Sequence, residues 1–203
     1  MSNKSIYDAD YYERGPITGK SLYENYRWIP ELTIPMVMIM IDLLGIKHGD
    51  SVLDIGCAKG YVVKAFRWLY RNAYGFDISK YAIRNADLQV KRYLNTKFID
   101  RDYDFAISKD TFEHFEVEEL REFLCILSAK KILVIVPIGE NDRYNVPLYE
   151  LDVTHNIRQP LEWWEDIFKS CGWKIIKSTY RIKGIKDNWK DYKKGNGFFV
   201  MER

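Results

Sequence analysis

The segment "VLDIGCAKGYVVKAF", residues 52–66, restricts the possible folds of this chain more than any other. An apolar run that contains one acid, Asp54, leads into a turn with Gly56 and Gly60, and the apolar positions that follow suit a helix packed on a sheet. A buried strand that passes through a glycine turn into a helix opens many α/β domains that bind a cofactor. The segment therefore predicts a strand over 51–55, a ligand-binding turn and a helix.

Strands and helices continue to alternate along the chain. The predicted strands cover 51–55, 73–77, 103–108 and 131–136, with a short edge strand near 92–95, and the predicted helices cover 61–70, 79–86, 117–127 and 160–171. This alternation predicts an α/β fold, a doubly wound, Rossmann-like and mostly parallel sheet with helices on both faces. No helix separates the last two strands, 173–182 and 197–203, so we expect the final strand to run antiparallel to the others.

The size and charge of the chain suit one domain without a bias toward polyanions or bilayers. Its 203 residues predict a single domain, 1–203, in which 1–48 form an N-terminal helical extension or lid and 49–203 form the core. With a formal net charge of +2, no global attraction to nucleic acid or membrane is expected. The apolar run "MVMIMI" is shorter than the roughly 20 residues that a bilayer requires, and we expect it to pack in the core.

The cysteines and the N-terminus favour a cytoplasmic protein. Cys57, Cys125 and Cys171 are odd in number and widely spaced, so they predict neither a disulfide framework nor a metal site. The N-terminal residues are polar and carry no sign of a signal peptide. A reducing compartment is the expectation.

The glycine turn does not fit a dinucleotide. Dinucleotide turns read G-x-G-x-x-G, whereas this turn reads G-x-x-x-G, and Asp54 would repel a pyrophosphate and attract an ammonium or a sulfonium. Asp77, at the end of the second strand, is placed to accept the hydroxyls of a ribose. A cationic amino-acid end, a ribose and no phosphate describe S-adenosylmethionine. A strand, turn and helix without any ligand is the alternative.

Three segments in order carry a family resemblance. "VLDIGCAKGYV", "YGFDIS" and "YDFAISKDTFEHF" resemble the first, second and fourth motifs of the class I S-adenosylmethionine-dependent methyltransferases, in particular the small-molecule group typified by ubiquinone-pathway and sugar methyltransferases. "LDVTH" and "PLEWWEDIFKSCGW" are similar to the segment before the penultimate strand of that group. The resemblance covers about residues 50–203.

The resemblance implies a cofactor-binding residue for most parts of the ligand. The methionine portion would be held by five residues: Asp54, Gly56, Cys57, Ala58 and Gly60. The ribose and one adenine face would meet Asp77 and Ile78, and the methyl end would meet Lys109 or Asp110. The segment that usually contacts adenine is shortened here, and Leu94 and Asn95 are its nearest candidates.

The N-terminal cluster of Tyr11, Tyr12 and Arg14 has two interpretations. It forms a lid over the cofactor, with Tyr12 or Arg14 near the cofactor carboxylate, or it is an aromatic helix docked for stability.

The acceptor is expected to be a small molecule and not a nucleobase. DNA methyltransferases that act on amino groups resemble one another in an acid or Asn followed by Pro-Pro and an aromatic residue, and this chain has "SKDTF" there. Enzymes that act on the carbon of cytosine use a Pro-Cys nucleophile, and this chain has "VPIG" after the strand 131–136. The loop 181–197 interleaves basic residues with Trp189 and Tyr192, which suits an anionic acceptor such as a nucleotide-linked sugar. A nucleic-acid strand and a solvated lysine-rich loop are the alternatives.

Methylation on oxygen requires a group that takes the hydroxyl proton. His155 is the candidate base, oriented by Asp152, with a structural loop cap as the alternative, while His114 is expected to pack behind the cofactor. Three further functions stay open: a nicotinamide-dependent enzyme, disfavoured by the missing glycine, a catalytically inactive S-adenosylmethionine-binding partner or sensor, and a nucleic-acid methyltransferase.

Overall fold

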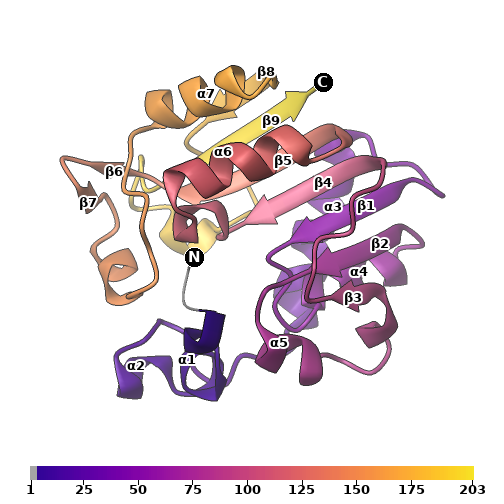
Figure 1. The fold of residues 1–203 in the computed structure, drawn as a ribbon, viewed down its shortest axis with the longest axis horizontal. Helices are drawn as coiled ribbons and strands as arrows, with labels where there is room; N and C mark the ends of the chain where they lie inside the picture. Colours follow the sequence, from indigo (N-terminus) through magenta and orange to yellow (C-terminus); the bar gives the residue numbers. More distant parts are fainter. Residues whose placement is uncertain (1–3) are drawn as a thin grey trace.

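The computed structural model describes residues 4–203 and contains one seven-stranded sheet (Figure 1). Its strand order is β3-β2-β1-β4-β5-β9-β8. The strands are β1 Ser51–Ile55, β2 Asn72–Phe76, β3 Leu94–Asn95, β4 Tyr103–Lys109, β5 Ala129–Pro137, β8 Lys174–Thr179 and β9 Asn196–Glu202. The pairs among β1 to β5 are parallel, and β9 is antiparallel to both of its neighbours. The predicted Rossmann-like sheet with an antiparallel last strand is confirmed.

The antiparallel strand lies inside the sheet, between β5 and β8. It pairs over seven positions with β5, and all of its residues except Glu202 are buried. β8 is the exposed edge, and a register shift between Ile175 and Lys177 interrupts its pairing with β9. A β8–β9 hairpin thus extends the parallel sheet without a second crossover helix.

Helices cover both faces of the sheet. They are α1 Ala9–Glu13, α2 Gly15–Thr18, α3 Pro30–Leu44, α4 Tyr61–Trp68, α5 Lys80–Arg84, α6 Val117–Ile126 and α7 Leu161–Ser170. α6 and α7 bury Leu124 and Trp164 against one face, and α3 and α4 bury Met40 and Phe66 on the other (Figure 1). The run "MVMIMI" lies in α3, where all of its residues except the exposed Met38 contribute to the second of these cores. Within 4–203, the helices are too short or too polar to cross a bilayer.

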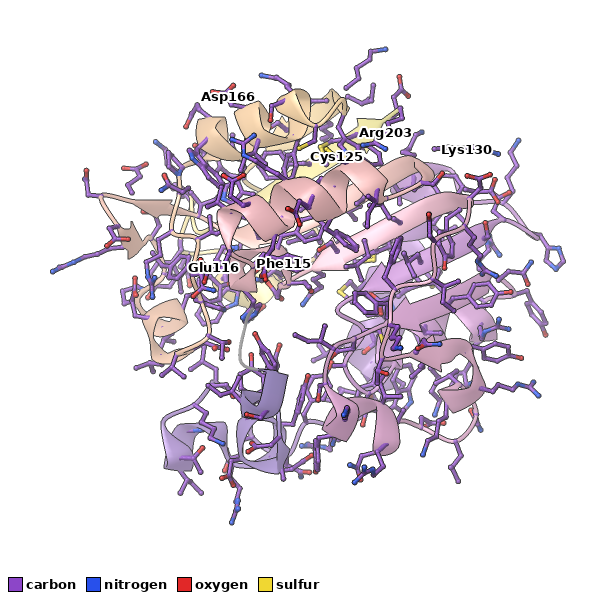
Figure 2. All side chains as sticks on the ribbon, viewed as in Figure 1. Phe115, Glu116, Cys125, Lys130, Asp166 and Arg203 are labelled. Carbon is purple, nitrogen blue, oxygen red and sulfur yellow. The ribbon has the colours of Figure 1, made fainter. Side chains whose placement is uncertain are left out.

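A layer of short elements lies beyond the carboxyl ends of the parallel strands. It contains α1, α2 and the hairpin of β6 Gly139–Glu140 with β7 Arg143–Tyr144 (Figure 1). The 3-10 helices of the chain are η1 Lys4–Ile6, η2 Lys91–Tyr93, η3 Phe112–His114, η4 Pro147–Leu151 and η5 Asp187–Trp189. Figure 2 shows Phe115 and Glu116 at the start of α6, on the side that faces the N-terminal segment, whereas Lys130 and Arg203 lie at the opposite end of the sheet.

Candidate functional site

A cavity of about 410 Å³ lies at the strand ends. Its walls come from the turns after β1, β2 and β4, from α6 and from the N-terminal segment, which contributes Tyr7, Tyr11, Tyr12 and Tyr23. This volume falls within the range of small-molecule sites, roughly 300–1,000 Å³. The position agrees with the rule that ligands of open α/β sheets bind beyond the carboxyl ends of the strands.

Two glycines allow the turn after β1 to pass close to its neighbours. Gly56 has φ +75°, and a Cβ there would lie 2.1 Å from Oγ1 of Thr111. Gly60 has φ +79°, and a Cβ there would lie 2.6 Å from Cδ1 of Leu94. Larger residues would combine backbone strain with a steric clash at both positions. Gly56 lines the cavity, and Gly60 sits behind it at the start of α4.

Asp54 is a buried carboxylate without a full set of partners. Its Oδ2 accepts no hydrogen bond from any residue in the described part of the chain. Burial, reinforced by the nearby charge of Asp77, raises the pKa of Asp54 to about 8, although Lys109 acts in the opposite direction. Asp54 itself is not part of the described cavity lining, whereas its neighbours Ile55 and Gly56 are. A cationic ligand group close to this turn would supply the missing partner, so the site fits a sulfonium or ammonium.

Asp77 connects the turn after β1 with the turn after β2 and lines the cavity. Its Oδ2 accepts from the backbone N–H of Ala58 at 2.7 Å, and its Oδ1 accepts from that of Ser79 at 2.7 Å. Burial raises the pKa of Asp77 to about 6, against the lowering effect of these two donors. Each carboxylate oxygen keeps a second lone pair. Asp77, Ala58 and Ile78 all line the cavity, as their predicted roles require.

The N-terminal segment covers the cavity with tyrosines. Tyr12 is buried and its ring is stacked on that of Tyr81 at 6.1 Å between centroids. Burial raises the pKa of the four tyrosines that this segment contributes to the cavity wall, to about 12 for Tyr7. All four side chains are therefore neutral at physiological pH. Arg14, the alternative contact for the cofactor carboxylate, is 61% exposed and forms an ion pair with Asp10. The structure brings Tyr12, and not Arg14, to the cavity.

Asp110 lies between two lysines. Lys109 Nζ lies 2.5 Å from its Oδ2, and Lys186 forms an ion pair with its Oδ1. Burial acts to raise the pKa of Asp110, but the two lysines outweigh it and hold that pKa well below its usual range. Asp110 lines the cavity, whereas Lys109 contacts Asp110 without being part of the described lining.

Lys186 belongs to the basic loop 181–197 and ties this loop to the cavity residue Asp110 through their ion pair. Among the basic residues of the loop 181–197, which was expected to suit an anionic acceptor, Lys190, Lys193 and Lys194 are exposed. Among the described residues, the cavity lining includes four carboxylates and no lysine or arginine. An anion site built by this loop therefore has no counterpart in the lining of the cavity.

His114 lies on the cavity wall. Its Nδ1 is 2.8 Å from Oγ1 of Thr154, which donates to Oδ1 of Asp152 at 2.5 Å. Since the Thr154 hydroxyl proton points to Asp152, Thr154 accepts from Nδ1–H of His114. The lone pair of His114 is then on Nε2.

His155 lies behind His114, with 4.6 Å between ring centroids. Its Nδ1 donates to the carbonyl oxygen of Tyr149 at 2.9 Å, and it is not among the residues of the cavity wall. Burial, together with His114, lowers the pKa of His155 to about 4. The structure thus exchanges the expected positions of the two histidines.

Other predicted residues support the site from behind. Leu94 packs on Gly60, and Asn95 accepts the backbone N–H of Asp77 through its carbonyl oxygen at 3.1 Å. Cys57 is buried, and burial raises the pKa of its thiol. None of these three lines the cavity as the structure describes it.

Sequence reasoning missed much of the apolar wall. Phe76, Phe115 and Phe123 line the cavity and come from the end of β2, from the end of η3 and from α6. Their signal was weak because aromatic residues at helical or strand spacing usually indicate a core.

The comparisons with known proteins agree with this architecture. A profile of the methyltransferase domain matches residues 39–178, more than half of the chain. No curated protein sequence is recognisably similar to it.

Solved structures share the fold at low sequence identity. A SAM-dependent methyltransferase from Archaeoglobus fulgidus is 16% identical, with 86% of this chain and 95% of that chain covered and a TM-score of 0.65. Magnesium protoporphyrin IX methyltransferase from Synechocystis PCC 6803, solved with bound SAH, is 15% identical over 84% of this chain and 82% of that chain, with a TM-score of 0.63. Phosphoethanolamine N-methyltransferase 2 from Haemonchus contortus, in complex with S-adenosyl-L-methionine, is 15% identical. The match covers 83% of this chain and 52% of that chain, with a TM-score of 0.63.

Proposed function

The chain belongs to the methyltransferase-domain family, and we propose that it transfers a methyl group from S-adenosylmethionine to a hydroxyl group of a small molecule. The methyl group is carried on a positively charged sulfur, so the chemistry needs alignment of donor and acceptor and a place for the acceptor proton.

The residues around the turn after β1 support S-adenosylmethionine as the methyl donor. Asp54 has a buried carboxyl oxygen without a partner directly before the cavity residues Ile55 and Gly56, and Asp77 offers lone pairs to ribose hydroxyls. Gly56 keeps the turn open where a side chain would collide with Thr111. Tyr12 and the other tyrosines of the N-terminal segment line the same space.

The arrangement of His114 carries the proposal for oxygen as the acceptor atom. Its Nδ1 is engaged by Thr154 and, through it, by Asp152. This fixes the tautomer and leaves Nε2 free to take a proton from a hydroxyl in the cavity. Burial lowers the pKa of His114, so the imidazole is unprotonated and ready to act at neutral pH.

The charge of the lining favours an uncharged or cationic acceptor. Glu119 and Glu122 of α6 add two carboxylates to those of Asp77 and Asp110. Rings of Phe115 and Phe123 offer an apolar surface beside them. This proposal replaces our expectation of an anionic acceptor, because the lysines of the loop 181–197 do not reach the described lining.

The test is methyl transfer from labelled S-adenosylmethionine to a panel of hydroxylated small molecules, with chelator present. We expect His114→Asn, which keeps a donor for Thr154 but has no basic nitrogen, to lower kcat by roughly 10²–10⁴-fold while donor affinity changes less than about twofold. His48→Asn, at an exposed histidine, is the matched control. Full turnover in His114→Asn, or products methylated only on nitrogen or carbon, would overturn the proposal.

A further inference from the structure

Glu113 has a carboxylate that the rest of the structure leaves unpaired. It lies in η3, between Phe112 and His114, and its side chain is 0% exposed. Neither of its carboxylate oxygens has a hydrogen-bond partner among residues 4–203. A buried carboxylate normally has a cation or several donors around it, because burial without partners costs several kcal/mol. An orphaned carboxylate at this depth therefore points to a missing partner.

Two histidine rings lie beside this carboxylate. Nε2 of His155 is 3.9 Å from Oε1 of Glu113, too far for a hydrogen bond. Since the Nδ1–H of His155 is donated to Tyr149, its Nε2 carries a lone pair. One ring nitrogen of His114, one of His155 and one carboxylate oxygen of Glu113 all lie within 4.8 Å of one another. Three groups that can each offer a lone pair thus converge on one point.

The nearby lysines do not neutralise this group. Lys109 and Lys186 both direct their ammonium groups to Asp110. The oxygens of Asp152 are engaged as well: Oδ2 accepts from Tyr11 at 2.7 Å, and Oδ1 accepts from Thr154. Both ammonium groups are thus paired with Asp110, and neither forms an ion pair with Glu113 within the described part of the chain.

We propose that Glu113, His114 and His155 bind a divalent transition-metal ion that accepts imidazole ligands, with Zn²⁺ and Co²⁺ as the test ions of choice. Imidazole nitrogens select these ions over Mg²⁺ and Ca²⁺, which prefer oxygen ligands. Metal bonds of roughly 2.0–2.2 Å put neighbouring ligand atoms about 3.3 Å apart. The three side chains need to approach one another by about an ångström.

The outer contacts of the histidines match those of metal ligands. A ligating histidine normally donates its other ring N–H to a carbonyl or to a group linked to a carboxylate. His155 donates to the carbonyl oxygen of Tyr149, and His114 is tied through Thr154 to Asp152. These bonds orient both rings before the ion arrives.

The ion would lie at the cavity wall, because His114 lines the cavity. With the ion bound, the lone pair of His114 belongs to the metal, so our assignment of His114 as the acceptor-side base applies to the metal-free protein. The metal site itself depends on neither the donor nor the acceptor. Its test needs no methyl transfer, and its failure would leave the proposed function standing.

The test is metal binding by the full chain after removal of metal with a chelator. Titration with Zn²⁺ and Co²⁺ should show one ion per chain, with visible absorption bands for Co²⁺ and a melting temperature several degrees higher. Glu113→Gln and His155→Gln should each weaken binding at least tenfold. Without metal, Glu113→Gln should melt at a temperature no lower than that of the wild type, since it replaces a buried carboxyl group that has no hydrogen-bond partner among residues 4–203.

Two controls keep the outcome decisive. His48→Gln removes the third histidine, which is exposed, and should bind the ion like the wild type. His155→Gln decides the matter if Glu113→Gln does not fold. Absence of saturable binding, or equal affinity in the wild type and both ligand variants, would overturn the proposal, and Glu113 would then be a protonated core residue.

Discussion

Asp54 stands at the end of β1 with one carboxylate oxygen that accepts no hydrogen bond from any described residue. Burial and the charge of Asp77 raise its pKa from 3.8 to about 8. Between these two pH values the folded chain keeps a proton that the unfolded chain has lost. The free energy of unfolding therefore falls as the pH rises through this window, and the loss is complete above about pH 8.

We expect Asp54→Asn to remove this pH-dependent loss. Without ligand, the melting temperature of the variant should exceed that of the wild type by a margin that grows from pH 5 to pH 8. The same variant should bind S-adenosylmethionine at least tenfold more weakly, because the partner of the cation is gone. Melting curves and calorimetric titrations check both effects. A variant that is destabilised equally at pH 5 and pH 8 would show instead that Asp54 is ionised and has a structural role.

The N-terminal segment is held over the cavity by contacts that are far apart in sequence. Nζ of Lys59, in the glycine turn, lies 2.6 Å from Oε1 of Glu13 and donates to the carbonyl oxygen of Tyr26 at 2.8 Å. Tyr81 donates to the same carboxylate oxygen at 3.0 Å, and Tyr11 binds Asp152. The turn that we propose to hold the donor is therefore bonded directly to the segment that covers it.

Glu13→Gln should loosen this cover. A charge-assisted hydrogen bond contributes about 1.5–3 kcal/mol, and 1.4 kcal/mol corresponds to a factor of ten. We expect S-adenosylmethionine to dissociate about tenfold faster from the variant, with little change in melting temperature, as measured by stopped-flow displacement. Asp10→Asn, which breaks the exposed ion pair with Arg14 in the same segment, is the matched control. Equal dissociation rates in all three proteins would mean that the segment is a static part of the fold.

At the scale of the whole molecule, the sheet and its helices could be predicted from the sequence because their signals are local. The β1 run and the turn residues Gly56 and Gly60 have few alternatives, since longer side chains would collide with Thr111 and Leu94. The direction of β9 followed from the absence of a helix after β8. The N-terminal 3-10 helix and the β6–β7 hairpin were not predicted, because they are short and depend on contacts across the strand ends.

The site was predicted less completely, since loops from distant parts of the chain decide it. Asp77 and Asp110 reach the cavity because each follows a strand whose end lies there. The order of His114 and His155 depends on the loop after η4, whose Asn156 and Ile157 donate to the carbonyl oxygen of Glu113 in η3. The sequence carries no periodic signal for this contact. Lys186 pairs with Asp110 from a loop of similar lysines, and nothing in the composition of that loop distinguishes it.

Calorimetric titration of the purified chain with S-adenosylmethionine, with its demethylated product and with nicotinamide dinucleotides tests the central claim most directly. Asp54 at the end of β1, the two-glycine spacing of the turn after it and the carboxyl group of Asp77 predict that the first two ligands bind, one per chain, and that the dinucleotides give no heat. Binding of a dinucleotide by folded protein that does not respond to S-adenosylmethionine or its product would contradict the account.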